Sequence, residues 1–273
     1  MRIVISLVTF NNSRLDLDLY ERGFRSAVRA VRPDARCRLI YTDNGEPSGI
    51  AARIEEAVSL PGQGNVGYGP ALHRIVAEAF ENAAADVVVT SNPDGVFHHG
   101  CLVRLLARIK EDPVQLLEAR QFPSEHPKSY DPRTGATSWA SGCCIALSRA
   151  LFDAVGNVDP TFWLYLEDVD YSWRARAAGV PVRIVPEALF AHDVTGRRAD
   201  ASARRQMLLS GRVLGRKWGN DKFLQWCERE LRRAGEGIPT GDVDPLRNVV
   251  PVPAAWRQIA DFDNPFVFGG QRW

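Results

Sequence analysis

The sequence lacks the patterns that mark several common protein classes. Its five cysteines are odd in number and show no C-x-x-C spacing. They therefore indicate reduced core residues of a cytosolic protein, and neither a disulfide framework nor a zinc site. No apolar run approaches the roughly 20 residues that a membrane-spanning helix needs. The opening ten residues lack a small-residue cleavage site, so we expect a first strand there and no signal peptide.

An excess of charge of one sign is also missing. The 273 residues include 34 Lys and Arg against 33 Asp and Glu, for a net charge of +1. This balance argues against nucleic-acid binding driven by bulk electrostatics. There is no H-x-x-x-H pair and no G-x-S-x-G motif, which excludes the common zinc and serine hydrolases. The 45% hydrophobic and 25% charged content is ordinary for a globular protein.

The sequence does contain an alternation of strand and helix patterns over about its first 120 residues. We expect strands at 2–9, 38–42, 86–91 and 114–119, and helices at 19–31, 50–58, 70–82 and 101–110. This alternation predicts an α/β fold, in which right-handed crossovers build a Rossmann-like, mostly parallel central sheet flanked by helices.

The remaining sequence predicts a second half and an appendage. Residues 122–136 are rich in Pro, Ser, Lys and Gly, a composition typical of a mobile connecting loop. After this loop we expect a strand at 137–147, a helix at 149–155, short strands at 182–185 and 188–192, a basic helical region at 197–231 and an extended tail.

Polar residues follow three of the predicted strands at their carboxyl ends, namely Thr9 to Asn11, Asp43-Asn44 and Asn92 to Asp94. Ligands of doubly wound sheets bind at those ends. Asp94 could hold a Mg²⁺ or Mn²⁺ ion that bridges phosphates, and Asp43 could accept hydrogen bonds from a nucleobase. Both residues also fit ordinary turns, because Asn-Pro-Asp-Gly and Asp-Asn-Gly favour turns on their own.

The segment from Asn65 to Gly69 looks like a phosphate cradle before a helix, but it matches neither the G-x-G-x-x-G fingerprint nor a P-loop. The signal is therefore weak. His192 ends a predicted strand, where a structural role and a role as a ligand are both open.

Basic residues recur in the C-terminal helical region: Arg197, Arg198, Arg204, Arg205, Arg212, Arg216 and Lys217. Met207, Leu214 and Trp218 stand opposite them, and such an amphipathic helix could lie on an anionic membrane. Gly211 and Gly215 interrupt the apolar stripe, which favours an ordinary surface helix with a solvated polar face.

The segment from Phe162 to Tyr171 places three carboxylates in four residues behind an aromatic run. Asp170 stands four residues before Arg174, the spacing of a good intrahelical ion pair, and Glu167 could join that pair. Asp168 has no cation three or four residues later, and such an acid at the first turn of a helix suits a catalytic role. All three carboxylates could instead be first-turn acids that complement the helix dipole.

Taken together, these stretches resemble the inverting, metal-dependent glycosyltransferases of family 2, which have the GT-A fold. They are most similar to the bacterial branch of rhamnosyl- and galactofuranosyltransferases. The resemblance covers about residues 3–220, and its motifs occur in the family's order. The motifs are Val8 to Asn11, Thr42 to Asn44, Gly64 to Gly69, Ser91 to Asp94, Ser141 to Cys144, Gly156 to Trp163, Leu166 to Asp170 and Ala191-His192.

The resemblance implies transfer of a sugar from a nucleoside diphosphate donor, a dTDP- or UDP-sugar such as rhamnose. The acceptor would be a hydroxyl of a glycan or lipid-linked saccharide in the synthesis of cell-surface polysaccharide such as lipopolysaccharide, with inversion at the anomeric carbon. Asp168 would be the general base, and at a helix N-terminus we expect it to stay ionised at neutral pH. Asp94 and His192 would hold Mn²⁺ or Mg²⁺. Asn92 stands where the family's D-x-D metal motif has its first Asp, which leaves Asp94 as the direct ligand.

The same resemblance implies the remaining site residues. The nucleotide sugar would be bound by Thr9, Asn11, Asp43, Asn65, Gly67, Asn92 and Asp94. The acceptor or donor-sugar pocket would be formed by Trp139, Gly142, Trp163, Glu167 and Asp170.

The chain would then divide into a GT-A catalytic domain at 1–196 and a helical and extended tail at 197–273 packed on it. Within the domain, 1–120 would bind the nucleotide sugar and 137–196 the acceptor. We expect a cytoplasmic protein, with peripheral contact at the inner face of the cell membrane and assembly into a homo-oligomer left open.

Two other functions remain open on the sequence. A GT-A module without activity could bind a sugar nucleotide or glycan as a scaffold or sensor, although Asp94, Asp168 and His192 weigh against it. A sugar nucleotidyltransferase would need a Gly-rich, basic triphosphate loop after the first strand, where this sequence reads Asn11-Asn12-Ser13-Arg14.

Overall fold

A central sheet organises the protein. The computed structural model describes residues 1–32, 34–126, 128–192 and 201–263. Within these residues an eight-stranded sheet has the order β3-β2-β1-β4-β7-β6-β8-β5. The strands are β1 (Arg2–Thr9), β2 (Arg36–Asp43), β3 (Ala57–Ser59), β4 (Val87–Ser91), β5 (Val96–Phe97), β6 (Leu116–Pro123), β7 (Ile145–Ser148) and β8 (Val182–His192). β5 and β7 run antiparallel to their neighbours and the other pairings are parallel. The predicted α/β fold with a mostly parallel sheet is confirmed.

The register of the central strands brings three strand ends together. β1 is apolar along almost its whole length and buried from Ile3 onwards, as expected for a parallel strand covered on both faces. Thr9 at the end of β1 lies opposite Asp43 at the end of β2, and Leu7 lies opposite Ser91 at the end of β4. The polar segments that follow these strands therefore leave the sheet at the same edge.

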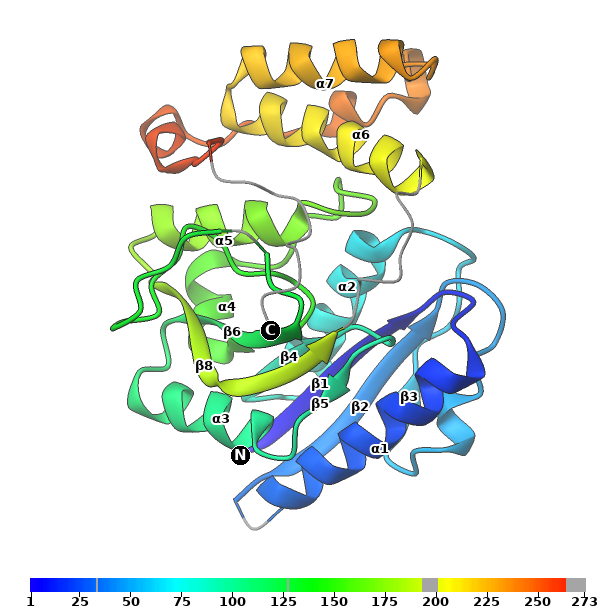
Figure 1. Cartoon of the computed structure of the whole chain (residues 1–273), viewed down its shortest axis with the longest axis vertical. Coiled ribbons are helices and arrows are strands. Elements are labelled where there is room, and N and C mark those ends of the chain that lie inside the picture. Colours follow the sequence, from blue (N-terminus) through cyan, green and yellow to red (C-terminus); the bar gives the residue numbers. More distant parts are fainter. Residues whose placement is uncertain (33, 127, 193–200, 264–273) are drawn as a thin grey trace.

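Helices cover both faces of the sheet (Figure 1). The helices are α1 (Arg14–Val31), α2 (Tyr68–Ala77), α3 (Cys101–Glu111), α4 (Arg149–Val155), α5 (Glu167–Ala177), α6 (Ala201–Trp218) and α7 (Asp221–Arg233). One apolar cluster packs α1 and α3 on one face of the sheet, and a second packs α2, α4 and α5 on the other. A π-helical turn at Glu78–Asn82 continues α2, and short 3₁₀ segments lie at Ile50–Ala52, Gly241–Val243, Pro245–Asn248 and Ala254–Ile259.

The last two helices add a further layer. Figure 1 shows α6 above α5, with α7 lying on α6. Trp173 of α5 and Trp218 of α6 meet edge to face with ring centroids 5.3 Å apart, inside a third apolar cluster that joins these two helices. The prediction that this region is an ordinary surface helix is therefore wrong for α6, since the half that runs from Leu208 to Trp218 is mostly buried.

The glycines of α6 have a packing function. A Cβ at Gly211 would lie 2.6 Å from Sγ of Cys227, and one at Gly215 would lie 3.0 Å from the backbone nitrogen of Leu224. Both glycines therefore allow α7 to approach α6 closely. The sequence interpretation, in which they interrupt an apolar stripe, is corrected by these contacts.

Three predicted elements differ from the structure. Residues 50–58 form a 3₁₀ turn and the strand β3 in place of a helix, because a short apolar pattern does not separate the two periods. α1 begins five residues earlier than expected, since Ser13 and Asp16 form a capping box at its start. β8 is one continuous strand through Pro186, with a register irregularity opposite Ala119 and Arg120.

The segment between β6 and β7 is more closely packed than its composition suggests. β7 starts only at Ile145, so most of the strand expected at 137–147 is irregular backbone. Within the loop expected at 122–136, the side chains of Ser124, Glu125 and Lys128 are buried. These three side chains therefore belong to the protein's interior, whereas residues 131–134 are exposed.

No helix in the described part of the chain combines the length and the apolar character that crossing a membrane requires.

The start of α2 packs directly on the backbone of the aromatic segment before α5, and this contact gives a test of the fold. A Cβ at Gly69 would lie 2.0 Å from the carbonyl oxygen of Phe162. We expect Gly69→Ala to destabilise the protein by about 1–3 kcal/mol through overpacking, although alanine is otherwise the better helix former. The measurement is the urea unfolding midpoint. Gly237→Ala is the control because nothing lies within 4 Å of its Cβ position; equal midpoints for the two variants would contradict the predicted contact.

Candidate active site

A cavity of about 650 Å³ opens at the carboxyl ends of β1 and β4. Ten of the residues predicted from the sequence line it: Asn65, Gly67, Asn92, Asp94, Trp139, Gly142, Trp163, Glu167, Asp168 and His192. Ligands of doubly wound sheets bind at this edge. The structure thus brings most of the predicted site residues into one cavity.

A second cavity, of about 730 Å³, lies at the opposite edge of the sheet, around the amino ends of β1 and β2. Its lining includes Arg2, Arg36 and Arg38 together with Glu55 and Glu56. It is therefore of mixed charge and lies away from the strand ends where such sheets bind ligands. We take the cavity that contains Asp168 as the candidate active site.

Asp168 is held at the start of α5 by backbone amides. The N–H of Gly142 donates to Oδ2 at 2.7 Å, and the N–H of Val169 donates to Oδ1 at 2.8 Å. Gly142 leaves room for this carboxyl group, because a Cβ there would lie in tight contact, 3.2 Å from that of Asp168. Thr90 fixes the same residue, since its Oγ1 donates to the carbonyl oxygen of Gly142 at 2.9 Å. The carboxylate is thus rigidly oriented by β4 and by the segment before β7.

Burial raises the pKa of Asp168 above its ordinary value, although the two backbone amides and the charge of Lys128 oppose that rise. A carboxylate with a raised pKa is a stronger base, as general base catalysis near neutral pH requires. We expect Asp168 to stay ionised at neutral pH because it lies at a helix N-terminus, but desolvation affects its pKa more than these backbone amides do.

A buried ion pair lies behind Asp168. Nζ of Lys128 donates to the carboxylate of Glu118 and to the carbonyl oxygen of Trp139, the latter at 2.8 Å. The same ammonium group lies 4.1 Å from the centroid of the Trp139 ring. Burial raises the pKa of Glu118, and the charge of Lys128 opposes this effect. Lys128 thus anchors one wall of the cavity.

Glu167 precedes Asp168 and shares the cavity with it. Its side chain is buried, and Oε2 has no hydrogen-bond partner in the described structure. Tyr165 and Leu166 just before it both have positive φ, at 69° and 68°. Such angles are unfavourable for these residue types and recur at functional sites. The resulting turn directs both carboxyl groups into the cavity, and Glu167 does not join the ion pair of Asp170 and Arg174.

Asp94 and His192 approach each other across the cavity. Oδ1 of Asp94 lies 3.4 Å from Nε2 of His192, and Nδ1 of His192 lies 3.4 Å from Oε1 of Gln121. Neighbouring ligands of an octahedral Mg²⁺ lie about 3 Å apart, so this pair fits two positions around one divalent ion. No cluster of three or more His, Cys, Asp or Glu converges in the described residues. Water and substrate oxygens usually supply several of the ligands of a protein-bound Mg²⁺.

Four predicted residues are not in the cavity lining, and three of them form its border at the ends of β1 and β2. Oγ1 of Thr9 donates to the carboxylate of Asp43. Asn11 has φ 50° and accepts a hydrogen bond from the N–H of Glu46 at 3.0 Å. Thr9 is buried and Asp43 half-buried. These three residues thus organise the loops beside the cavity.

The glycine-rich loop before α2 is fixed against the site. Asn44 donates from Nδ2 to the carbonyl oxygen of Gly67 at 2.8 Å, and the N–H of Gly67 donates to Oδ1 of Asn65 at 3.3 Å. Gly67 has φ 90°, and a Cβ there would lie 2.2 Å from the carbonyl oxygen of Trp163. Only glycine suits this position, where two walls of the cavity meet.

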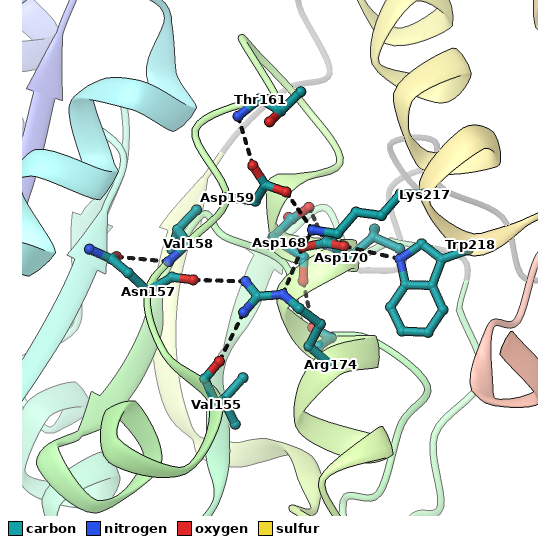
Figure 2. Close-up of polar contacts among 12 residues, drawn as sticks. Val155, Asn157, Val158, Asp159, Thr161, Asp168, Asp170, Arg174, Lys217 and Trp218 are labelled. Carbon is teal, nitrogen blue, oxygen red and sulfur yellow. Dashed lines mark hydrogen bonds and ion pairs between the residues drawn. The ribbon is translucent and has the colours of Figure 1, made fainter. Parts of the chain in front are cut away.

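The fourth residue, Asp170, lies behind the cavity at the centre of a buried network (Figure 2). It is 0% exposed and accepts from Nε of Arg174 at 2.9 Å, Nζ of Lys217 at 2.8 Å and Nε1 of Trp218 at 3.0 Å. The predicted pair with Arg174 is confirmed. The predicted place of Asp170 in the sugar pocket is corrected, because these contacts tie α5 to α6.

The network extends to the loop between α4 and α5. Lys217 also donates to the carboxylate of Asp159, and Arg174 donates to the carbonyl oxygens of Val155 and Asn157 at 3.0 and 2.8 Å (Figure 2). Burial would raise the pKa of Asp159, but the charge and hydrogen bond of Lys217 hold that pKa below its ordinary value. One ammonium group therefore bridges two carboxylates of different segments.

The other basic residues of α6 are mostly paired as well. Arg204 and Arg205 pair with Glu230 and Glu236, both at 2.9 Å. Arg212 is buried and pairs with Glu228 at 3.3 Å and Asp244 at 3.2 Å. Arg216 is exposed, and the predicted Arg197 and Arg198 lie outside the described residues. The solvated basic face expected from the sequence is therefore wrong for Arg212 and Lys217.

Several parts of the cavity wall could not be found from the sequence. Tyr68, His126, Cys143 and the N-terminal turns of α6, including Arg205 and Met207, also line the cavity. Their separation along the chain leaves no short motif. Cys143 belongs to the Ser141 to Cys144 motif and Tyr68 to the Gly64 to Gly69 motif, but neither motif assigns these two side chains to the cavity.

The solved structures that this fold resembles are glycosyltransferases. It superposes on GalNAc-T7, solved with UDP, GalNAc and Mn²⁺, with a TM-score of 0.63 and 13% identity over 90% of this chain and 53% of the other. For the mannosyltransferase PcManGT of Pyrobaculum calidifontis, solved with GDP-Man and Mn²⁺, the TM-score is 0.58 at 12% identity over 90% and 77% of the two chains. The chain has the GT-A glycosyltransferase fold. The S. aureus protein TarS also has this likeness, with a TM-score of 0.56 at 12% identity over 85% of this chain and 43% of that one.

A sequence relative agrees with this GT-A assignment. The chain is 27% identical over 201 residues to the N-acetylglucosaminyl-diphospho-decaprenol L-rhamnosyltransferase of Mycobacterium tuberculosis, in two strains. The match covers 56% of this chain and 66% of the relative, which is slightly less than two thirds of the relative's length. No protein-family model matches the sequence. The fold and this relative confirm the resemblance to GT-A glycosyltransferases of family 2 that the motifs indicate.

The network around Asp170 gives a second testable prediction. Lys217→Met leaves the buried Asp170 and the half-buried Asp159 without their shared cation, and breaking a buried ion pair in this way costs about 3–5 kcal/mol. We expect a lower urea unfolding midpoint. Lys222→Met on α7 makes the same chemical change at an exposed position and should leave the midpoint unchanged. If the two variants unfolded at the same urea concentration, the network would contribute nothing to stability.

Proposed function

We propose that the protein is an inverting glycosyltransferase that moves a sugar from a nucleoside diphosphate to a hydroxyl group. The donor is a dTDP- or UDP-sugar such as a rhamnose donor, and the acceptor is a glycan or lipid-linked saccharide of a cell-surface polysaccharide. The observation that carries this proposal is the meeting of Asp168 with the pair of Asp94 and His192 in one cavity at the carboxyl edge of the sheet.

Asp168 accepts the proton of the acceptor hydroxyl. Each of its oxygens takes one backbone amide and keeps a further lone pair for the substrate. As the O–H bond breaks, the acceptor oxygen attacks the anomeric carbon from the face opposite the diphosphate. The bond from that carbon to the diphosphate oxygen breaks, and the configuration inverts. Asp168 then returns to its ionised form by losing this proton to solvent, and the cycle can repeat.

Asp94 and His192 hold the divalent ion, Mn²⁺ or Mg²⁺. Such an ion supplies positive charge that stabilises the leaving diphosphate. The chain's own residues position the rest of the donor. Thr9, Asn11 and Asp43 border the nucleobase, and the rigid loop from Asn65 to Gly67 contacts the ribose or the sugar.

The relatives support this assignment by what their names state. The Mycobacterium tuberculosis relative is a rhamnosyltransferase whose named acceptor carries a decaprenol chain, which supports a lipid-linked acceptor here. Two of the structural neighbours were solved with Mn²⁺ and a nucleotide or nucleotide sugar, which supports the metal-dependent donor. A lipid-linked acceptor would require contact with a membrane, and we propose that a cytoplasmic enzyme makes this contact at the inner face of the cell membrane.

The first test of this function removes the base. Asp168→Asn should lower kcat by about 10²- to 10⁴-fold, the usual contribution of general acid–base catalysis, while donor binding measured by calorimetry stays within a few-fold. Because the pKa of Asp168 is raised and the ionised form is active, the wild-type rate should fall as the pH drops through a value above 3.8. Asp153→Asn on the exposed side of α4 is the control. Turnover retained by Asp168→Asn would overturn the assignment of the base.

The second test concerns the metal. Asp94→Ala should remove most of the increase in UDP or dTDP affinity that Mn²⁺ gives, because the ion then loses a protein ligand. Calorimetric titration of the nucleotide with and without Mn²⁺ measures this difference. Asp34→Ala, an exposed residue at the opposite edge of the sheet, should behave as wild type. An unchanged Mn²⁺ effect in Asp94→Ala would exclude Asp94 as a ligand.

A further inference from the structure

Glu167 and Asp168 are adjacent carboxyl groups that share one cavity but have different partners. Glu167 is only 5% exposed, and burial raises the pKa of both groups. Two neighbouring carboxylates in a desolvated site rarely both ionise, because each negative charge opposes the other. The partners of each group decide which of the two carries the charge.

Asp168 has the partners that favour an anion. It accepts backbone N–H groups on both oxygens, from Gly142 at 2.7 Å and from Val169 at 2.8 Å. The charge of Lys128 also lowers its pKa. Hydrogen bonds to the charged form stabilise that form. The ionised member of the pair is therefore Asp168.

Glu167 has the opposite surroundings. Its Oε2 is buried without a hydrogen-bond partner in the described structure. Burial and the charge of Asp168 raise the pKa of Glu167 well above its ordinary value, and only its own backbone amide opposes them. An ionised oxygen left in this position would carry the full cost of desolvation. A protonated oxygen would instead be a hydrogen-bond donor that faces the cavity.

We propose that Glu167 is a neutral carboxylic acid that donates a hydrogen bond from Oε2 to an oxygen atom of the bound sugar, while Asp168 carries the single negative charge of the pair. This inference rests on the proposed sugar transfer for the identity of the ligand. A carboxylate can only accept hydrogen bonds, whereas the acid form can donate to a hydroxyl or ring oxygen. One negative charge fewer in the cavity also reduces repulsion of a diphosphate donor.

Other titratable groups around the cavity agree with this distribution of charge. Burial raises the pKa of Tyr68 well above its ordinary value, so the phenol is neutral at physiological pH. Glu118 is neutralised by Lys128. The cavity also contains His126 and Arg205 of α6, and Arg205 pairs with Glu236. His192 faces Asp94.

The first experiment compares two substitutions in a sugar-transfer assay. Glu167→Gln keeps the shape and a donor at the Oε2 position, whereas Glu167→Ala removes both. We expect kcat/KM of the Gln variant to exceed that of the Ala variant by about 10-fold or more, because a buried substrate oxygen without a partner is costly. The alkaline decline of the wild-type rate, caused by loss of the Glu167 proton, should be absent in Glu167→Gln. Equal losses in the two variants would overturn the donor role.

The second experiment reads the protonation state without turnover. The infrared spectrum of the resting protein at neutral pH should contain the carbonyl stretch of a protonated carboxylic acid, and Glu167→Gln should remove it. Glu125→Gln is the matched control, since Glu125 is also buried but pairs with Arg120, and this variant should keep the band. A wild-type band that survives in Glu167→Gln would overturn the assignment. A band assigned to Glu167 in a protein that binds no nucleotide sugar would instead overturn the proposed function and, with it, the sugar as ligand.

Discussion

The buried hydrogen-bond network around the carboxylate of Asp170 is the interaction on which the arrangement of this protein depends. The carboxylate receives hydrogen bonds from Arg174 of α5 and from Lys217 and Trp218 of α6. Lys217 extends the contact to Asp159, in the loop between α4 and α5. A fully buried carboxylate requires such partners, because an unpaired charge in the interior is strongly unfavourable. The network therefore fixes the start of α5, and with it the direction in which Glu167 and Asp168 face the cavity.

The buried carboxyl groups are of two kinds, structural ones that pair with a cationic side chain and functional ones that do not. Asp170 and Glu118 are each neutralised by a cation within the protein. Glu167 and Asp168 lie next to each other at the cavity wall, and the hydrogen bonds that their carboxyl groups accept come from backbone amides. Groups whose charge is not cancelled by a side chain are the ones able to exchange protons or hydrogen bonds with a ligand. The GT-A fold gives this cavity its place, at the carboxyl edge of the parallel strands.

Much of the fold could be predicted because its signals are local. The apolar runs of β1 and β4, and the polar residues after them, indicate where strands end and where a ligand binds. The pair of Asp170 and Arg174 follows from a spacing of four residues. The contact of Asp170 with Lys217 joins residues 47 apart, and no spacing rule describes it. For this reason the sequence placed Asp170 in the sugar pocket and Lys217 on a solvated face.

The other differences between the sequence-based predictions and the structure have equally specific causes. In the sequence, Gly211 and Gly215 interrupt an apolar stripe, and nothing there shows that α7 packs against them. The positive φ angles of Tyr165 and Leu166 have no sequence signal, because neither residue type favours that conformation. Residues 50–58 contain too short an apolar pattern to distinguish a helix from a turn and strand.

The proposed function is tested most directly by a thermal-shift screen with UDP-, dTDP- and GDP-sugars, each with and without Mn²⁺. A ligand that binds the folded protein at 100 times its Kd stabilises it by about 2.7 kcal/mol, which raises the Tm by several degrees in a protein of this size. We predict such a rise for a dTDP- or UDP-sugar, larger with Mn²⁺ than without it. If no nucleotide sugar raises the Tm under either condition, the cavity is not a sugar-nucleotide site and the proposed function is wrong.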